Sequence, residues 1–323
     1  MKSKIELRDA WTALMAARSF VLACHQRPDG DTLGSALAVS RALRAMSKDV
    51  VVLSEDGVPE NYRFVPESDT ILRSTGRRDF EAGVLVDSEG IKRVGSAAEP
   101  VTAARMTACI DHHVPDDEFG DVRIVDPAYS AAAELALDLL DANDVPIDNL
   151  MAWQLLTGIV SDTGAFRYAN TTASALRAAA RLIDLGADPS VIAREVYESR
   201  PLGAARLLGR ALASLETEND GRIVIAVVTH ADFQELGAAD EDTDGIVNHV
   251  RAVRGTRVAL LLREMEPEMV RVSLRSKDGY DVNRVARAFG GGGHVGAAGC
   301  TIKAPLDQAR RMLIDEVAKW MDS

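Results

Sequence analysis

Histidine and aspartate residues gather in four short segments of this 323-residue chain. The chain has six histidines in all, and use of histidine as an ordinary core residue would not place three of them in such segments. The imidazole and carboxylate groups, with no cysteine among them, suit Mn²⁺, Mg²⁺ or a related divalent ion rather than a structural zinc. The segments are His25-Gln-Arg-Pro-Asp29-Gly-Asp31, Asp87, Asp111-His112-His113 and Ser161-Asp162-Thr163-Gly164.

Each segment has a simpler structural explanation when it is considered alone. The first would serve as an Asp-Gly-Asp turn with a helix N-cap at Asp31 or Thr32. Asp87 would serve as a turn residue, and residues 111–113 as a polar loop. Asp162 would form an Asx-turn at the end of an apolar helix. Their common position at the ends of strands and of a helix instead favours one shared site.

The elements that must position these residues form a predicted parallel sheet. Continuous apolar runs rich in β-branched residues predict buried strands at 19–24, 49–54, 83–87 and 106–110. Apolar residues at helical spacing predict helices at 32–47, 130–142, 147–160, 172–186 and 189–199. This order predicts a doubly wound α/β fold, in which ligands bind at the carboxyl ends of the strands. Because adjacent histidines cannot share one face of a strand, we expect one to bind metal and the other to meet the substrate.

A second, smaller α/β domain is expected in the C-terminal part of the chain. Residues 222–229 are strongly apolar and predict its first strand. The following elements are predicted as strands at 257–263 and 269–275 and helices at 243–253, 281–289 and 306–321. We therefore predict a parallel-sheet domain at 1–200, a helical linker at 201–216 and the second domain at 217–323.

The net charge of the chain excludes some classes of binding partner. A net charge of −12 argues against a protein that coats long nucleic acid, because such binding neutralises many phosphates with Lys and Arg. Residues 251–287 are locally basic, with nine Lys or Arg against five Asp or Glu, and suit either a solvated face or the wall of an anion pocket. Three cysteines without a CxxC pair, no recognisable signal peptide and no long apolar run predict a cytoplasmic protein without a membrane span.

Two sets of residues give the chain a family resemblance. Asp111-His112-His113 resembles the motif for which the DHH phosphoesterases are named. Ser273-Leu-Arg275-Ser276-Lys277 and the run from Gly290 to Gly299 resemble the associated domain that follows the DHH domain in this family. The chain looks most like the two-domain oligoribonucleases (nanoRNases) that also dephosphorylate 3′-phosphoadenosine 5′-phosphate.

The resemblance implies a role for each residue of the four segments. It implies two divalent ions, with Mn²⁺ preferred and Mg²⁺ as the alternative, bridged by Asp87. Asp111 is expected to orient a ligating imidazole, and His113 to face the substrate phosphate as a donor or general acid. The implied ligands are His25, Asp29 and Asp87 for one ion and Asp31, Asp87, His112 and Asp162 for the other.

The glycine run near the C-terminus contains a GxGxxG pattern, Gly291 to Gly296. We do not interpret it as a dinucleotide fingerprint, because it follows a predicted helix and leads into a strand-like segment, the reverse of the required order. Glycines there would let a phosphate or nucleotide approach the backbone amides. With Arg275 as a planar phosphate partner, the candidate substrate-binding residues are Gly292, Gly293 and His294. A flexible connector and an exposed strand arginine are the simpler alternatives.

The sequence thus predicts a two-metal phosphoesterase acting on short RNA and on 3′-phosphoadenosine 5′-phosphate. Phosphodiesterases for cyclic di-AMP or linear dinucleotides such as pApA and pGpG are the alternative. A pyrophosphatase fits Arg275 and the glycine run less well, and a RecJ-type exonuclease on long strands does not fit the acidic chain. A non-catalytic nucleotide sensor is disfavoured because every implied ligand position is filled. A homodimer is left open.

Overall fold

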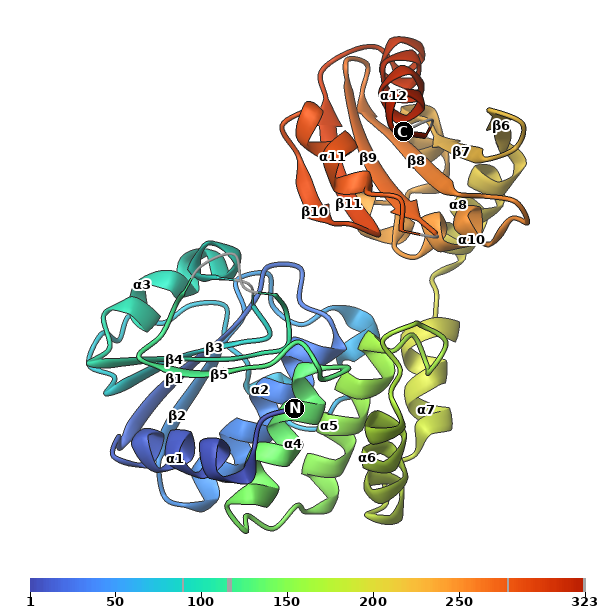
Figure 1. Ribbon diagram of the computed structural model, residues 1–323. Helices are drawn as coiled ribbons and strands as arrows, with labels where there is room; N and C mark the ends of the chain where they lie inside the picture. The colour runs from blue at the N-terminus through green and yellow to red at the C-terminus, as the bar shows by residue number, and fades with distance from the viewer. Residues whose placement is uncertain (89, 115–117, 278, 322–323) are drawn as a thin grey trace. The chain divides into compact units, whose positions relative to one another are not determined.

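The structure is a computed structural model that describes residues 1–88, 90–114, 118–277 and 279–321. The chain divides into two compact units, Met1–Ser199 and Arg200–Ser323 (Figure 1). Each unit contains its own sheet and its own hydrophobic clusters. The α/β class and the parallel sheet predicted for the first unit are confirmed.

The sheet of the first unit has five strands in the order β2-β1-β3-β4-β5, and every neighbouring pair is parallel. The four predicted strands are present, and the fifth, β5, was missed because it is short and only partly buried. Since all strands run in one direction, their carboxyl ends lie along one edge. The strands are β1 (Ser19–Cys24), β2 (Asp49–Leu53), β3 (Ala82–Val86), β4 (Met106–Asp111) and β5 (Val122–Val125).

Helices cover both faces of this sheet, as the alternation of side chains along β1 requires (Figure 1). Phe20 and Leu22 point into the larger cluster with four long helices, while Val21 and Ala23 point into the smaller cluster on the other face. The four helices are α1 (Lys4–Met15), α2 (Gly30–Ala45), α4 (Ala132–Ala142) and α5 (Asn149–Asp162), and buried residues of the two helices that follow α5 also belong to this cluster. The opposite face carries η3 (Ile91–Ala97) and α3 (Ala98–Thr102).

Shorter elements complete the first unit. Two 3₁₀ turns, η1 (Glu60–Tyr62) and η2 (Ser68–Thr70), lie between β2 and β3. After α5 come α6 (Ala173–Asp184), α7 (Pro189–Ala193) and the π-helical turn η4 (Arg194–Glu198). Both α6 and α7 begin with a side-chain cap, from Thr172 and Asp188 respectively, so each start is defined by a hydrogen bond to the backbone.

The second unit has a six-stranded mixed sheet in the order β10-β11-β9-β8-β7-β6. β7 and β8 are parallel and the other pairs antiparallel. The segment predicted as a helical linker at 201–216 contains the helix α8 (Leu202–Ala213), whose apolar residues pack with β7. The strands are β6 (Glu216–Glu218), β7 (Ile223–Val228), β8 (Val258–Glu266), β9 (Met269–Ser276), β10 (Gly292–His294) and β11 (Ala297–Ile302).

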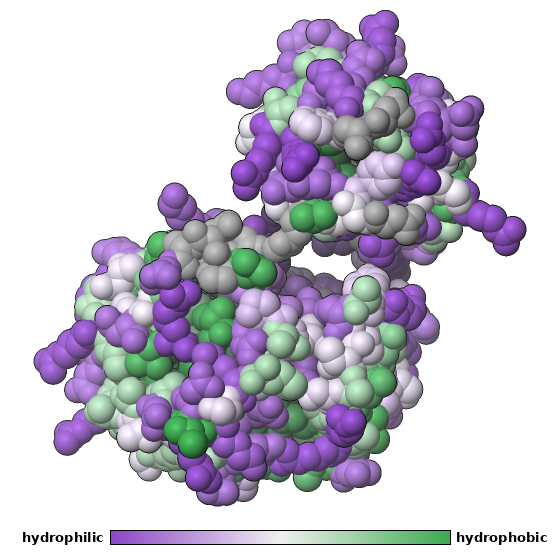
Figure 2. Space-filling view, viewed as in Figure 1, coloured by the Kyte–Doolittle hydropathy of each residue, from purple (hydrophilic) through white to green (hydrophobic). Residues whose placement is uncertain are grey.

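The helices of the second unit divide between the two faces of its sheet. α8, α9 and α10 share one cluster with β7 and β8, and α11 and α12 share the other with β9 and β11. In the view of Figure 2, hydrophilic side chains predominate on the surface of each unit. Within the described part of the chain, every helix is too short or too polar to cross a membrane. The helices are α8 (Leu202–Ala213), α9 (His230–Leu236), η5 (Asp240–Thr243), α10 (Ile246–Ala252), α11 (Val282–Ala288) and α12 (Leu306–Met321).

A glycine sets the distance between α2 and α5, the two helices that carry the Asp29-Gly-Asp31 and Asp162 segments. A Cβ atom on Gly34 would lie 2.1 Å from the backbone carbonyl oxygen of Gln154 and 3.1 Å from its carbonyl carbon. Neither atom can move without moving α5. The close contact of these two helices therefore requires a residue without a side chain at position 34.

We expect Gly34→Ala to destabilise the first unit by about 1–3 kcal/mol, because the added methyl group must push two packed helices apart. Urea denaturation followed by circular dichroism measures the change. Gly76→Ala is the matched control, since a Cβ atom at Gly76 meets nothing within 4 Å. If Gly34→Ala unfolds at the same urea concentration as Gly76→Ala, the contact between the helices is looser than described.

Candidate metal centre

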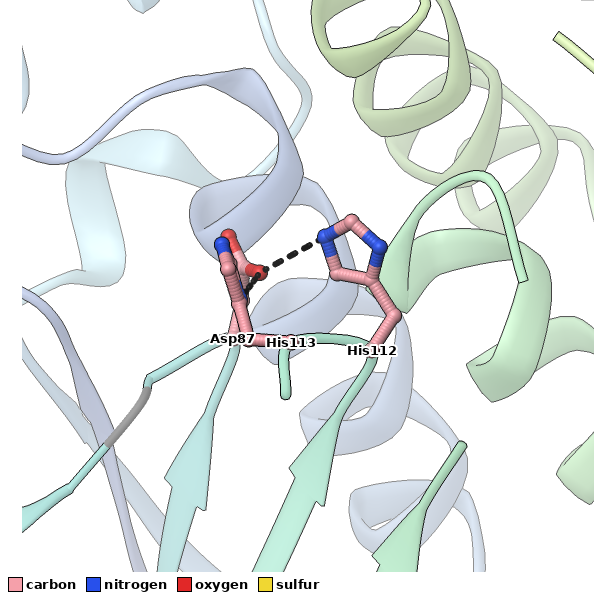
Figure 3. A group of neighbouring side chains, drawn as sticks. All are labelled: Asp87, His112 and His113. Atoms are coloured by element: carbon pink, nitrogen blue, oxygen red, sulfur yellow. Dashed lines mark ion pairs between the residues drawn. The ribbon is translucent and has the colours of Figure 1, made fainter. Parts of the chain in front are cut away.

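The polar residues at the carboxyl ends of three strands lie along one edge of the first sheet. His25 directly follows β1, Asp87 directly follows β3, and Asp111 is the last residue of β4. His112 and His113 come next, and Figure 3 shows both imidazoles beside the carboxylate of Asp87. The parallel register of β1, β3 and β4 produces this convergence, because it places the three strand ends side by side.

One group of donors surrounds Asp87 from the β1 side. The Nε2 atom of His25 lies 3.6 Å from Oδ2 of Asp87 and 3.8 Å from Oδ1 of Asp29. The Nδ1 atom of His25 lies 2.9 Å from the carbonyl oxygen of Gln26, which can only accept, so Nδ1 carries a proton and Nε2 is the nitrogen that can bind a metal. His25, Asp29 and Asp87 each present one ligand atom within 4.8 Å of the others, a spacing that fits a metal ion.

A second group lies on the other side of Asp87. The Nε2 atom of His112 lies 3.5 Å from Asp87 Oδ1, 3.5 Å from Asp162 Oδ2 and 3.8 Å from Asp31 Oδ2. Asp162 reaches this point from the last residue of α5, and Asp31 from the first turn of α2. Asp87 therefore faces His25 with one oxygen and His112 with the other, the arrangement of a carboxylate that bridges two cations.

Two atoms at the middle of the cluster are buried and have no hydrogen-bond partner among the residues that the structure describes. They are Oδ1 of Asp87 and Nε2 of His112, which face each other. A buried acceptor is normally paired, and leaving one unpaired costs free energy. Both atoms carry lone pairs when the Nδ1 atom of His112 donates to the carbonyl oxygen of Tyr129, 3.3 Å away. A cation between them would satisfy both, so the donor set fits a divalent metal.

The proton affinities of the carboxylates show how much negative charge is concentrated here. Burial and the charges of Asp87 and Asp162 raise the pKa of Asp31 well above its ordinary value. Burial raises the pKa of Asp162 to about 7, with the charge of Asp87 acting in the same direction. Burial alone would lower the pKa of His25, but the neighbouring carboxylates outweigh it and raise that pKa. The cluster thus lacks positive charge, which protons or metal ions must supply.

Asp111, which the sequence predicts to orient a ligating imidazole, contacts the ring of His113. Its Oδ1 accepts hydrogen bonds from Nδ1 of His113 at 2.8 Å and from the backbone N–H of His113 at 3.2 Å. The ring of the implied ligand His112 is held by a backbone carbonyl instead. Asp111 is almost completely buried, so its carboxylate is fixed in place and holds the ring of His113.

The two adjacent imidazoles also lie closer together than strand alternation suggested. Their ring centroids are 4.5 Å apart, and Nδ1 of His113 lies 3.5 Å from Oδ1 of Asp87. Both residues follow the final residue of β4, where side chains no longer alternate between faces. His113, Asp87 and His112 satisfy the distance criterion for a metal group. The Nδ1 atom of His113 cannot serve as a ligand while it donates its proton to Asp111.

The predicted substrate-binding residues lie in the second unit, on β9 and β10. Arg275 pairs with Ala297 in the antiparallel register, and Ala297 pairs in turn with His294. The same strands pair Ser273 with Gly299 and Gly299 with Gly292, so the backbone places this set on one face of the sheet. The side chain of His294 lies outside the described residues.

Glycine is required at position 293 for two reasons. Its φ of 143° lies in a region that side chains rarely adopt, and a Cβ atom would come within 2.5 Å of the carbonyl oxygen of Ala297. Gly293 therefore keeps β10 close to β11. The backbone structure alone therefore explains the glycine at position 293, and no bound ligand is needed to explain it.

Several contacts of the metal centre could not be found by motif analysis. Both carboxylate oxygens of Asp31 accept backbone N–H groups at the start of α4, from Ala132 at 2.6 Å and Ala133 at 2.8 Å. The side chain of Asn170 donates to Oδ2 of Asp162 at 3.2 Å. The alanines carry no functional group, and asparagine before Thr-Thr at a helix start reads as an ordinary cap signal.

Comparison with known proteins agrees with this two-unit layout. Residues 19–159 match the DHH family, N-terminal domain, and residues 220–323 match the DHHA1 domain. A solved structure of an exopolyphosphatase-related protein from Bacteroides fragilis superposes with a TM-score of 0.92 at 24% identity, covering 98% of this chain and 97% of that one. At this identity the likeness establishes the fold.

Two relatives carry closer sequence similarity. The bifunctional oligoribonuclease and PAP phosphatase NrnA of Thermus thermophilus is 36% identical over 298 residues, covering 92% of this chain and 88% of the relative. The protein of the same name from Bacillus subtilis is 28% identical, covering 92% and 93%. The chain therefore belongs to the DHH phosphoesterase family, in the group that contains the bifunctional oligoribonuclease and PAP phosphatase, and its second unit carries the DHHA1 domain.

Proposed function

We propose that this chain hydrolyses phosphoester bonds in short oligoribonucleotides and removes the 3′-phosphate of 3′-phosphoadenosine 5′-phosphate, with two divalent ions at the centre around Asp87. The observation that carries the proposal is the position of Asp87. Its two oxygens face different imidazoles at 3.5 and 3.6 Å, and the oxygen on the His112 side is buried and unpaired. Two related enzymes are named for both activities.

The residues would divide between the two ions as the two groups divide around Asp87. His25, Asp29 and Asp87 would hold one ion. Asp31, His112 and Asp162 would hold the other, with Asp87 shared. Bound divalent ions would lower the pKa of water and neutralise charge on the phosphate. Ligands made of carboxylate and imidazole suit Mn²⁺, with Mg²⁺ as the alternative.

His113 would supply the proton-transfer chemistry. Asp111 holds its Nδ1 and fixes the ring, so Nε2 is the nitrogen that can act on a phosphate or on the leaving oxygen. A buried carboxylate next to an imidazole stabilises the protonated ring. His113 would therefore donate a proton to the departing alkoxide, with Asp111 as the residue that positions it.

The second unit would bind the nucleotide part of the substrate. Arg275 stands on a strand whose neighbour, β11, carries only small residues opposite Ser273 and Arg275, namely Gly299 and Ala297. A sheet face with small residues beside an arginine leaves room for a phosphate or a base and provides charge for it. The acidic chain offers no long basic track, which favours short substrates.

A substrate panel tests the proposal directly. The panel contains oligoribonucleotides of two to about ten nucleotides, 3′-phosphoadenosine 5′-phosphate, cyclic di-AMP, its linear product and diphosphate, each assayed with Mn²⁺. We expect turnover of the short oligoribonucleotides and of the bisphosphate. Turnover of diphosphate alone, or of none of these compounds, would contradict the proposal.

Removal of metal should abolish turnover. We expect no activity in excess chelator and recovery on addition of Mn²⁺. The carboxylates around Asp87 concentrate negative charge, and in the active enzyme bound metal ions would neutralise it. Hydrolysis of a short oligoribonucleotide is the measurement. Undiminished activity in excess chelator would mean that the centre works without metal.

Substitution of the two histidines should have different effects. His112→Ala should weaken metal binding, because Nε2 of His112 faces three carboxylates. His113→Ala should leave metal binding nearly intact and slow turnover by about 10²-fold or more, the usual loss when a general acid is removed. Metal content and kcat are measured on both variants. Equal loss of metal from both would show that His113 is itself a ligand.

Substitution of Arg275 should affect substrate binding and spare the metals. We expect Arg275→Gln to raise KM for short oligoribonucleotides while metal content stays constant. In the unaltered protein, kcat/KM should fall as the strand lengthens beyond about five nucleotides, since the net charge of −12 disfavours the binding of further phosphates. Arg311→Gln, an exposed arginine of α12, is the control. If the KM of Arg275→Gln equals that of Arg311→Gln, Arg275 does not contribute to substrate binding.

A further inference from the structure

A short segment before and at the start of α4 contacts two of the three donors of one metal group directly and the third through another residue. The segment is 129–133, which belongs to none of the four polar segments of the sequence. Its donors and acceptors reach Asp31, His112 and, through Asn170, Asp162. These three residues are the group that faces Asp87 from the His112 side. No contact from 129–133 to His25 or Asp29 occurs among the described hydrogen bonds.

The first contact fixes the imidazole. The carbonyl oxygen of Tyr129 accepts from Nδ1 of His112 at 3.3 Å, so Nε2 is directed at the carboxylates. Tyr129 is itself held by a hydrogen bond from its hydroxyl to Asp138, 2.9 Å away on α4. A ring nitrogen that donates to a backbone carbonyl is the usual way in which a protein orients a metal-binding histidine.

The second contact fixes the carboxylate of Asp31. Its oxygens accept the N–H groups of Ala132 and Ala133, and the N-cap residue Ala131 provides no side-chain cap to compete. Asp31 thus caps α4 from another helix, and its charge meets the positive end of that helix. Gly158 leaves the space for it, because a Cβ atom there would lie 2.7 Å from Asp31 Oδ1.

The third contact is indirect and passes through Asn170. Ser130 and Asn170 form a reciprocal pair: Oγ of Ser130 donates to the carbonyl oxygen of Asn170 at 2.6 Å, and Nδ2 of Asn170 donates to the carbonyl oxygen of Ser130 at 2.9 Å. The same Nδ2 lies 3.2 Å from Oδ2 of Asp162. This is the oxygen that faces Nε2 of His112. Ser130 is completely buried, and its N–H donates to the buried Glu134.

An unusual turn returns the chain to Asp162 so that Asn170 can make this contact. Three consecutive residues, Gly164, Ala165 and Phe166, have positive φ angles of 57°, 54° and 63°. Such a run is rare for residues with a Cβ atom and reverses the chain directly after the helix end. The contact is therefore built from two separate parts of the first unit.

We infer that Ser130 and Asn170 are positioning residues for one of the two metal sites, the site formed by Asp31, His112 and Asp162. Hydrogen bonds from segment 129–133 hold the side chains of this site in place, directly or through Asn170. The inference rests on the proposed function, because it takes these three side chains as metal ligands. It predicts that the two sites can be weakened separately.

Calorimetric titration of the metal-free protein with Mn²⁺ tests this. The unaltered protein should bind two equivalents. In Asn170→Ala and Ser130→Ala we expect one binding step to weaken by about 10–100-fold, the usual effect of removing a residue that orients a ligand, and the other step to stay unchanged. Asn143→Ala is the matched control, since the side chain of Asn143 donates to the carbonyl oxygen of Leu139 near the end of α4 and makes no other hydrogen bond to the described residues.

The outcomes separate the inference from the proposed function. If the unaltered protein binds no Mn²⁺, the proposed function itself fails. If it binds two equivalents and the Asn170 and Ser130 variants match Asn143→Ala, these residues do not position a ligand and the inference is wrong. If both binding steps weaken equally, the residues support the fold generally and the inference is also wrong. Because Asn170 is exposed, its variants should fold, which thermal unfolding of the metal-free proteins checks.

Discussion

The concentration of carboxylates around Asp87 is the constraint on which the rest of the first unit depends. Four aspartates and three histidines converge there, and two of the aspartates, Asp31 and Asp87, are nearly inaccessible to water. Ionised carboxylates removed from water are costly unless positive charge or hydrogen bonds compensate them. Hydrogen bonds compensate Asp31 through α4. Cations between Asp87 and its neighbours are the remaining compensation, and binding them is the function we assign to the centre.

The fold meets this constraint with rigid elements rather than loops alone. Three parallel strands bring His25, Asp87 and the 111–113 segment to one edge, and the buried sheet between two helical layers holds those strand ends in place. α2 and α5, packed closely at Gly34, bring Asp31 and Asp162 to the same edge. Ligands on packed strands and helices keep their geometry before the metals and the substrate arrive, which is the condition for electrostatic catalysis.

The sequence predicted those parts of the structure that follow from local pattern. Buried parallel strands are continuous apolar runs, so β1 to β4 and the residues at their ends could be identified, and with them the convergence of the ligands. Helix α1 was missed although Ser3 and Glu6 form a capping box at its start. Short or half-exposed strands such as β5, β6 and β10 lack a pattern long enough to identify.

Contacts between distant parts of the chain could not be predicted. Asp31 and Ala132 are 101 residues apart, and their hydrogen bond uses a backbone N–H that every residue except proline possesses. The ring that Asp111 contacts could not be predicted for a related reason, since a carboxylate beside two histidines can hold either ring and only the backbone geometry at the end of β4 decides. Motifs therefore revealed the donors of the metal centre, and the structure was needed for the residues that hold them.

One measurement tests the two-metal account most directly. Crystals of the protein grown with Mn²⁺, measured at the manganese absorption edge, should give two anomalous peaks about 3.5–4 Å apart, the usual separation in two-metal sites. One peak should lie among His25, Asp29 and Asp87 and the other among Asp31, Asp87, His112 and Asp162. A single peak, or two peaks of which only one contacts Asp87, would contradict the central claim that this carboxylate bridges two ions.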